Sequence, residues 1–245
     1  MNNLRVSTIT CISQLSSEIN LDVLYDNIEI NKTILYIENG SDKYKGYAKK
    51  FKKKARKAST TKSRFYNQST LHLFNEKIIN IKIFNNGKIQ LTGLRKEKDI
   101  MDTIHILIEE LSRLLIIPNN THIISYKIVL INSDFDVGYK INREMLYRYI
   151  NHIGLFCTYE PCTYPGVNIK YYFNECNDNG ICNCNDICIG KGTGIGDNNC
   201  KKVTIAVFKS GKIIITGGQN LTQVNKVYKF INELLIKHKD KFILE

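Results

Sequence analysis

Phe84-Asn-Asn-Gly-Lys-Ile-Gln-Leu-Thr-Gly93 recurs later in the chain as Phe208-Lys-Ser-Gly-Lys-Ile-Ile-Ile-Thr-Gly217. Six of the ten positions are identical, and the two copies lie 124 residues apart. In each copy an alternating apolar segment runs into Gly-Lys and then resumes, which is typical of two strands joined by a tight turn. The preceding segments also match, with Ile79, Ile81 and Ile83 against Val203, Ile205 and Val207. The sequence therefore predicts an internal duplication built around a β-hairpin.

Helical patterns surround each hairpin. The longer one follows it, with one apolar face formed by Ile100, Ile104, Leu107, Leu111 and Leu115 in the first copy and by Val224, Val227, Ile231 and Leu234 in the second. Shorter helices are expected at residues 21–28 and 143–153, and Asn142 and Asn220 are expected to be N-caps. A Pro118-Asn-Asn break sets the predicted repeats at 1–118 and 119–245.

Each repeat thus has the order strand, helix, several strands, long helix. Joined edge to edge, two such repeats give one antiparallel sheet with helices on one side and an open face on the other. The fold class predicted is α+β. Two insertions lack periodicity and are expected to be loops: the basic stretch 42–62 and the Cys-, Gly- and Asn-rich stretch 174–202.

Charge and composition narrow the function. Thirty-five basic and 23 acidic residues in a chain of 245 leave a net charge of +12, which favours an anionic partner. The chain contains no run of eighteen apolar residues, so no membrane-spanning segment is expected. No signal peptide is apparent. The cysteines suggest a reducing, intracellular compartment, either the nucleus or, for a virus, the host cytoplasm or viral factory. No catalytic spacing of histidines or carboxylates is found, so an enzyme is not expected.

Strand alternation places Phe208 on one face of the second hairpin with Lys212, Ile214 and Thr216, opposite Ile213 and Ile215. An apolar, aromatic face in a basic protein suggests a minor-groove DNA binder, in which apolar side chains wedge between bases while lysines hold phosphates. The alternative is that Phe84 and Phe208 are core residues and that the turn lysines, Lys88 and Lys212, are only solvated.

The repeated F-x-[NS]-G-K-I-x-[LI]-T-G resembles the signature hairpin of the TATA-box-binding protein family. Val6-Ser-Thr-Ile9 resembles the family's opening strand, and Tyr159-Glu-Pro-Cys-Thr-Tyr-Pro-Gly166 resembles its second stirrup loop. The resemblance covers most of the chain outside the insertions, and the insertions are similar to those of divergent versions from large DNA viruses. It implies a saddle of two pseudo-symmetric repeats, with helices on the convex side, that binds and bends DNA. The family is itself a known case of such bending, with a kink of about 80° in its bound DNA.

The resemblance assigns roles residue by residue. The wedging aromatics correspond to Phe65 and Phe84 in the first repeat and to Tyr164 and Phe208 in the second. The other positions that it implies for DNA contact are Leu4, Val6, Asn86, Lys88, Gln90, Thr92, Leu130, Asn132, Lys170, Ser210, Lys212, Ile214 and Thr216. Glu160 corresponds to an acidic residue that the family uses to contact a IIB-type initiation factor.

Several of these positions depart from the family pattern. Leu4 and Leu130 stand where the family has asparagines, although Asn132 lies on the same strand face as Leu130. Gln90 replaces a base-packing valine, and Lys82 replaces a groove-facing leucine. Bending is still expected, but a standard TATA element is not implied.

Five cysteines crowd residues 176–200 with the pattern C-x5-C-x-C-x3-C-x11-C. Thiolates among many glycines fit a loop around a tetrahedral zinc ion, with Cys182, Cys184, Cys188 and Cys200 as the four ligands. Free thiols in a loop and disulfides are the alternatives. No cofactor is expected to be required, and a structural zinc ion is the one candidate.

The sequence thus predicts a general transcription initiation factor that binds and bends double-stranded DNA as a monomer. Its expected partners are IIB-type factors and RNA polymerase, with no membrane. Two alternatives stay open: a sequence-tolerant binder of single strands that stacks bases on its aromatics, and a saddle kept for protein interaction.

Overall fold

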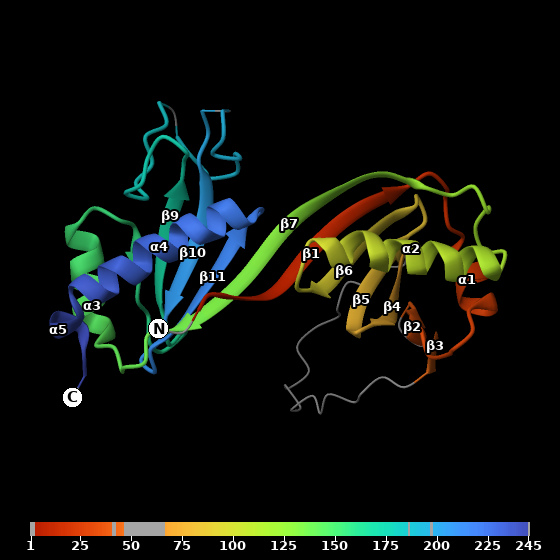
Figure 1. Cartoon of the computed structure of the whole chain (residues 1–245), viewed down its shortest axis with the longest axis horizontal. Helices are drawn as coiled ribbons and strands as arrows, with labels where there is room; N and C mark the ends of the chain where they lie inside the picture. The colour runs from red at the N-terminus through yellow and green to blue at the C-terminus, as the bar shows by residue number, and fades with distance from the viewer. Residues whose placement is uncertain (1–2, 41–42, 47–66, 186, 197, 245) are drawn as a thin grey trace. The chain divides into compact units, whose positions relative to one another are not determined.

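The computed structural model describes residues 3–40, 43–46, 67–185, 187–196 and 198–244. The chain divides into two compact units (Figure 1). The N-terminal unit is Ile9–Lys127, and the C-terminal unit is Ile128–Glu245 with Met1–Thr8. Strands β1 (Arg5–Leu15) and β7 (Ile123–Asp136) contribute residues to both units. The two compact units therefore do not coincide with the two predicted sequence repeats. The repeat boundary at 118/119 stays a prediction.

The N-terminal unit is an antiparallel sheet with the strand order β3-β2-β4-β5-β6-β1. Its further strands are β2 (Ile34–Asn39), β3 (Lys43–Gly46), β4 (Gln68–Asn75), β5 (Lys77–Phe84) and β6 (Lys88–Leu94), and its helices are α1 (Leu21–Asn27) and α2 (Lys98–Arg113). The predicted first hairpin is β5–β6, and α2 lies across the strands on one face of the sheet (Figure 1).

The C-terminal unit repeats this plan, with the strand order β7-β11-β10-β9-β8. Its further strands are β8 (Cys157–Thr158), β9 (Val167–Phe173), β10 (Lys201–Val207) and β11 (Lys212–Gly218), and its helices are α3 (Arg143–His152), α4 (Leu221–Lys237) and α5 (Lys239–Phe242). The predicted second hairpin is β10–β11, and α4 lies across β9, β10 and β11 (Figure 1).

Alternating burial explains why one face of each sheet takes the helices. In the N-terminal unit the buried set is Ile79, Ile81, Ile83, Ile89 and Leu91 on the sheet and Ile100, Ile104, Leu107 and Leu111 on α2. In the C-terminal unit it is Val203, Ile205, Val207, Ile213 and Ile215 on the sheet and Val224, Val227, Ile231 and Leu235 on α4. Each such side chain contributes about 1.5–3 kcal/mol when fully buried. The face predicted opposite Phe208 in the second hairpin is buried, as expected, and the first hairpin shows the same alternation.

The predicted faces of the long helices are right except at their last residues. Leu115 is 82% exposed, because α2 already ends at Arg113 and the backbone turns left-handed at Leu115, with a φ of 55°. On α4, Leu235 is buried and Leu234 is only half-buried, so the helix presents the later leucine to the sheet. Adjacent residues point about 100° apart around a helix axis. A prediction that is wrong by one residue therefore selects the half-buried Leu234 in place of the buried Leu235.

The expected helix starts are confirmed. The Asn142 side chain accepts a hydrogen bond from the Met145 backbone N–H at 3.2 Å, and Asn220 accepts one from the Gln223 N–H at 2.9 Å. A side-chain acceptor at the N-cap satisfies one of the unpaired N–H groups of the first helical turn. Both helices therefore begin where the sequence indicates.

The two insertions have different outcomes. Residues 174–200, where described, form no helix or extended strand, as expected, and Lys201 and Lys202 already belong to β10. In the basic insertion, however, Lys43–Gly46 forms β3 against β2, so the expectation of a loop is wrong there. Pairing with a strand that lies earlier in the chain creates β3, and local periodicity does not report such pairing. Residue 42 and residues 47–62 of this insertion lie outside the described part. Among the helices described, none is both long enough and apolar enough to cross a membrane.

Candidate nucleic-acid interface

The face of the C-terminal sheet away from α4 carries polar and apolar side chains in register. Thr216 lies opposite Asn132 on β7 and opposite Thr204 on β10, and Thr204 in turn lies opposite Lys170 on β9. All four are half-buried, whereas their sequence neighbours on the other face are buried beneath the helices. The predicted contact residues of β7, β9 and β11 therefore lie on one open face.

Phe208 and Tyr164 form an aromatic pair beside this face. Their ring centroids are 5.8 Å apart with an interplanar angle of 61°. A Cβ atom placed on Gly166 would lie 2.9 Å from the Tyr164 ring and 3.3 Å from the Phe208 ring, so the backbone packs directly against both. Tyr164 remains 41% exposed. The pair is thus held in place while one ring is open to solvent, which a wedge between base steps requires.

The open face of the N-terminal sheet places Phe84 in the matching position. Phe84, Asn86, Lys88 and Gln90 line a shallow pocket of about 520 Å³, together with Ile12, Asn67 and Asn85. Across the strands, Gln90 lies opposite Lys82 on β5 and Ile12 on β1, and Thr92 lies opposite Asn80 and Thr10. Five of the predicted contact residues, Phe84, Asn86, Lys88, Gln90 and Thr92, are therefore gathered on this unit's open face. Phe65, the predicted partner of Phe84, lies outside the described residues.

The two hairpin turns are built alike. The Asn86 side chain accepts a hydrogen bond from the Lys88 N–H at 3.2 Å, and the Ser210 hydroxyl accepts one from the Lys212 N–H at 3.4 Å. Such side-chain to backbone bonds stabilise tight turns. These two polar residues therefore have a structural role, and they leave Lys88 and Lys212 exposed at the start of the outgoing strands.

Glycine is required at both turns. Gly87 and Gly211 have positive φ values of 75° and 89°. An added Cβ would lie 2.2 Å from a backbone carbonyl oxygen in each case, that of Ser17 or that of Tyr139. The same obstruction in both repeats shows that the duplicated Gly-Lys reflects a duplicated geometry.

The first strands contribute the remaining predicted positions. Leu4 precedes β1, Val6 lies in β1, and Leu130 lies in β7; all three are half-buried. The Thr216 hydroxyl donates to the Asn132 side-chain oxygen, and Ile214 lies opposite Asp134. This bond orients the Asn132 amide so that its N–H groups point away from Thr216, and those groups are the donors that base acceptors need.

Lys170 and Lys202 concentrate positive charge on β9 and β10. Burial lowers the pKa of Lys170, and the nearby Lys202 lowers it further. The Lys170 ammonium donates to the Thr204 hydroxyl at 3.1 Å. A phosphate at this place would favour the charged form of Lys170, so the site is suited to an anion. Lys202 was not among the predicted residues, although its alternation with Thr204 along β10 was a usable signal.

Sequence reasoning also missed an acidic group. Asp134 accepts two hydrogen bonds from one Arg5 nitrogen, at 3.0 and 2.9 Å, and its side chain is only 15% exposed. Asp134 and Asp136 follow Asn132 at steps of two, so strand alternation puts them on the open face. Arg5 therefore neutralises a carboxylate that would otherwise repel a nucleic acid.

Glu160 lies in the loop that carries Tyr164. Its backbone oxygen accepts hydrogen bonds from the N–H groups of Thr163 and Tyr164, at 3.0 and 2.9 Å, which closes the turn. The residue itself is exposed. The role of Glu160 in partner binding stays a prediction.

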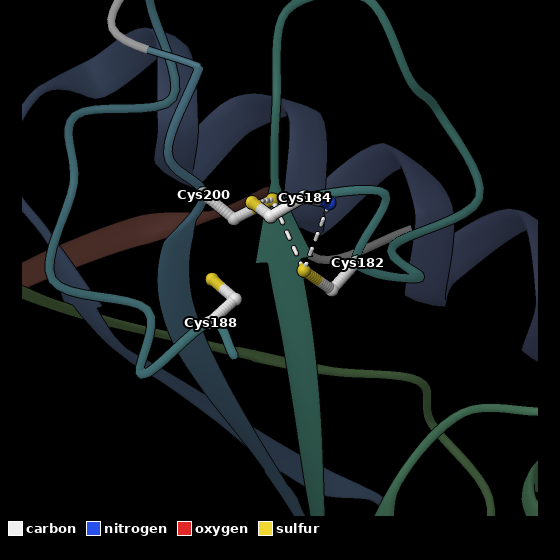
Figure 2. A group of neighbouring side chains, drawn as sticks. All are labelled: Cys182, Cys184, Cys188 and Cys200. Atoms are coloured by element: carbon white, nitrogen blue, oxygen red, sulfur yellow. Dashed lines mark hydrogen bonds between the residues drawn. The ribbon is translucent and has the colours of Figure 1, made fainter. Parts of the chain in front are cut away.

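A second cluster lies in the Cys-rich insertion, between β9 and β10 in the chain. Figure 2 shows the thiols of Cys182, Cys184, Cys188 and Cys200 gathered around a common centre. Their sulfur atoms all lie within 4.8 Å of one another. The structure thus brings together the four cysteines chosen from the spacing, and Cys176 is exposed outside the group.

Comparisons with known proteins agree with this geometry. The family model described as "Transcription factor TFIID (or TATA-binding protein, TBP)" matches residues 125–238. A "TATA-box-binding protein-like" protein of Acanthamoeba polyphaga mimivirus is 28% identical, over 98% of this chain and 67% of its own length. The chain is similar in sequence to the TATA-box-binding protein family.

Two further relatives extend the comparison. "TATA-box-binding protein 2" of Haloferax volcanii is 28% identical over an alignment that covers 62% of this chain and 67% of its own length. The structure of Methanococcus jannaschii TBP superposes with a TM-score of 0.56 at 18% identity, covering 96% of this chain and 99% of that one. The predicted α+β fold of the TATA-box-binding protein is therefore confirmed. In sequence the chain is similar to TATA-box-binding-protein-like proteins, and in fold it is similar to a TATA-box-binding protein.

Proposed function

We propose that the chain binds double-stranded DNA in the minor groove through the open faces of its two units, bends it, and so nucleates promoter complexes. The observation that carries the proposal is the matched placement of Phe84 and Phe208. Phe84 is the last residue of β5 and Phe208 directly follows β10, and each precedes a glycine turn and an exposed lysine. Aromatic rings so placed can enter between base steps, at a cost of a few kcal/mol per unstacked step.

Phosphate contacts offset that cost. Lys88, Lys170 and Lys212 are the proposed phosphate contacts, and the net charge of +12 supports attraction to DNA. Asn132 and Thr216 offer short polar side chains to the groove floor, where every base pair presents hydrogen-bond acceptors. Because Leu4, Leu130 and Gln90 depart from the family pattern, the preferred element is proposed to differ from a standard TATA box.

The remaining assignments follow from the family relationship. Val6, Asn86, Thr92, Tyr164, Ser210 and Ile214 are proposed to complete the DNA-contacting set, together with Phe65. Glu160 is proposed to contact a IIB-type initiation factor, with RNA polymerase recruited afterwards to a single copy of the chain on DNA. Loss of factor binding in Glu160→Arg, with DNA binding kept, is the outcome that supports this role.

Selection of bound duplexes from a random pool, followed by sequencing, tests the function directly. The proposal expects enrichment of a defined element, rich in flexible pyrimidine–purine steps that kink readily. Competition with the same sequence as single strands is the companion measurement. Preference for single strands would instead support a stacking platform, and absence of any salt-dependent DNA binding would support a protein-interaction module.

Lys212→Ala is expected to reduce the slope of log affinity against log salt concentration by about one, because one phosphate contact is lost. Affinity should fall similarly for all duplex sequences, since phosphates carry no sequence information. Titrations at several salt concentrations measure the slope. Lys237→Ala removes the same charge from the last turn of α4 and is the matched control. An equal loss in both variants would contradict a specific contact.

Asp134→Asn is expected to tighten duplex binding about fivefold at low salt, equivalent to about 1 kcal/mol. The change removes a negative charge from the open face and frees Arg5 for a phosphate. The gain should shrink at high salt because the interaction is screened. Asp240→Asn makes the same charge change on α5 and should have a smaller effect. Weaker binding in Asp134→Asn would mean that the Arg5–Asp134 pair is needed to shape the face.

A further inference from the structure

The cysteine cluster defined above, Cys182, Cys184, Cys188 and Cys200, belongs to the insertion between β9 and β10 and plays no part in the proposed DNA interface. Cys200 is fully buried directly before β10 begins, and the other three come from the loop that precedes it. The four side chains converge from different stretches of that loop (Figure 2). Convergence of four thiols from a segment with no helix or extended strand needs an explanation beyond packing.

The spacing of the sulfur atoms fits one metal ion. Zinc–sulfur bonds of about 2.3 Å in a tetrahedron place the sulfurs about 3.8 Å apart. The Cys184 and Cys200 sulfurs are 3.4 Å apart, and those of Cys200 and Cys182 are 3.7 Å apart. A disulfide bond would need about 2.05 Å. The cluster is therefore open enough for an ion at its centre and too open for disulfide bonds.

The surrounding backbone holds the loop in this shape. The Cys184 N–H donates to the Cys182 sulfur at 3.4 Å, an outer hydrogen bond of the kind that orients metal ligands. Gly192 and Gly194 donate to the backbone oxygens of Cys200 and Asn199, at 3.1 and 2.9 Å. A Cβ on Gly192 would lie 2.4 Å from Asn199, so only glycine permits this approach.

The same loop is fastened to α4. The Lys226 ammonium donates to the backbone oxygen of Asn174 at 2.9 Å and pairs with Asp178, and the Gln223 amide donates to the Thr193 oxygen at 2.8 Å. These contacts lie at the start of the insertion and on its flank. Between these two attachment points, the stretches of the insertion that carry the four cysteines meet at the sulfur cluster.

We propose that Cys182, Cys184, Cys188 and Cys200 bind one structural zinc ion that fastens the insertion onto β10 and α4. Four protein thiolates fill the tetrahedron and leave no position for water, so the ion stabilises structure and performs no catalysis. The thiol protons pass to solvent as the metal binds, and no oxidation occurs. Zinc content and cobalt absorption do not depend on DNA binding. A failure of this proposal is therefore distinguishable from a failure of the proposed function.

The test uses the full chain, purified under reducing conditions without chelator. We expect about one zinc ion per chain and, after exchange for Co²⁺, the absorption bands of a tetrahedral cobalt–thiolate site. Zinc near zero, with Co²⁺ giving no thiolate bands, would overturn the proposal. In a parallel preparation without reductant, a mass lower by four hydrogens would also overturn it, because two disulfides would then account for the thiols.

Variants locate the ligands. Cys184→Ser with Cys188→Ser should lose the metal and be cleaved within residues 174–200 at least about tenfold faster by protease, because the loop opens. Cys176→Ser, an exposed cysteine of the same insertion, is the matched control and should keep both metal and protection. If the double variant fails to fold, Co²⁺ titration of the unmodified chain still decides the question. Metal loss in Cys176→Ser, or full retention in the double variant, contradicts the proposed ligand set.

Discussion

Phe84→Ala combined with Phe208→Ala is expected to weaken duplex binding by about 30-fold or more, because stacking on an aromatic ring contributes about 1–3 kcal/mol per base. Bending should be lost with it, since the two rings are the proposed wedges. Energy transfer between dyes at the duplex ends reports the bend, and a titration of the same duplex reports the affinity.

Two controls separate this effect from misfolding. Both rings are partly packed against neighbouring residues, so thermal unfolding of the doubly substituted chain must first show that it still folds cooperatively. Leu115→Ala removes a side chain that is 82% exposed just after α2, and it should alter neither bend nor affinity. A doubly substituted chain that folds normally and still bends DNA with full affinity would show that the wedge mechanism is wrong.

Gly211→Ala is expected to lower the free energy of unfolding by at least about 3 kcal/mol. The left-handed backbone costs an alanine about 1–2 kcal/mol. The new Cβ must also displace the Tyr139 carbonyl, 2.2 Å away, and Val137 donates its N–H to the Gly211 oxygen in the same turn. Because this turn positions Phe208 and Lys212, DNA affinity should fall as well. Urea unfolding measures the stability.

Gly138→Ala is the matched control for this prediction. Gly138 lies in the same unit with a similar φ of 80°, but a Cβ there would meet nothing within 4 Å. It should therefore cost only the backbone strain, about 1–2 kcal/mol. Equal losses in the two variants would mean that strain alone, rather than the close approach to Tyr139, makes Gly211 necessary.

Local features made most of the fold predictable. The Gly-Lys turns, the alternation on β10 and β11, and the caps at Asn142 and Asn220 each act within a few residues, and all appear as expected. β3 was missed because its pairing with β2 depends on distant packing. The Arg5–Asp134 pair was missed for the same reason, since its members are 129 residues apart in the chain.

The candidate site was predictable where the duplication constrains it. Phe84 and Phe208 lie on the open faces because strand alternation has a fixed period of two. The four cysteines could be chosen by spacing, yet only the fold explains how Cys200, separated from Cys188 by eleven residues, reaches the others: it stands at the entry to β10. Preference for a DNA element was not predictable, because Leu4, Leu130 and Gln90 depart from the family pattern.

Replacing the A·T pairs of the selected element with inosine·cytosine pairs tests whether the chain reads DNA through the minor groove. Inosine lacks the guanine 2-amino group, so this pair keeps the minor-groove acceptors of A·T while its major groove resembles that of G·C. If recognition is in the minor groove, affinity and bend angle survive this replacement and are lost when G·C pairs are used instead. Loss of binding to the inosine duplex would place recognition in the major groove and contradict the account.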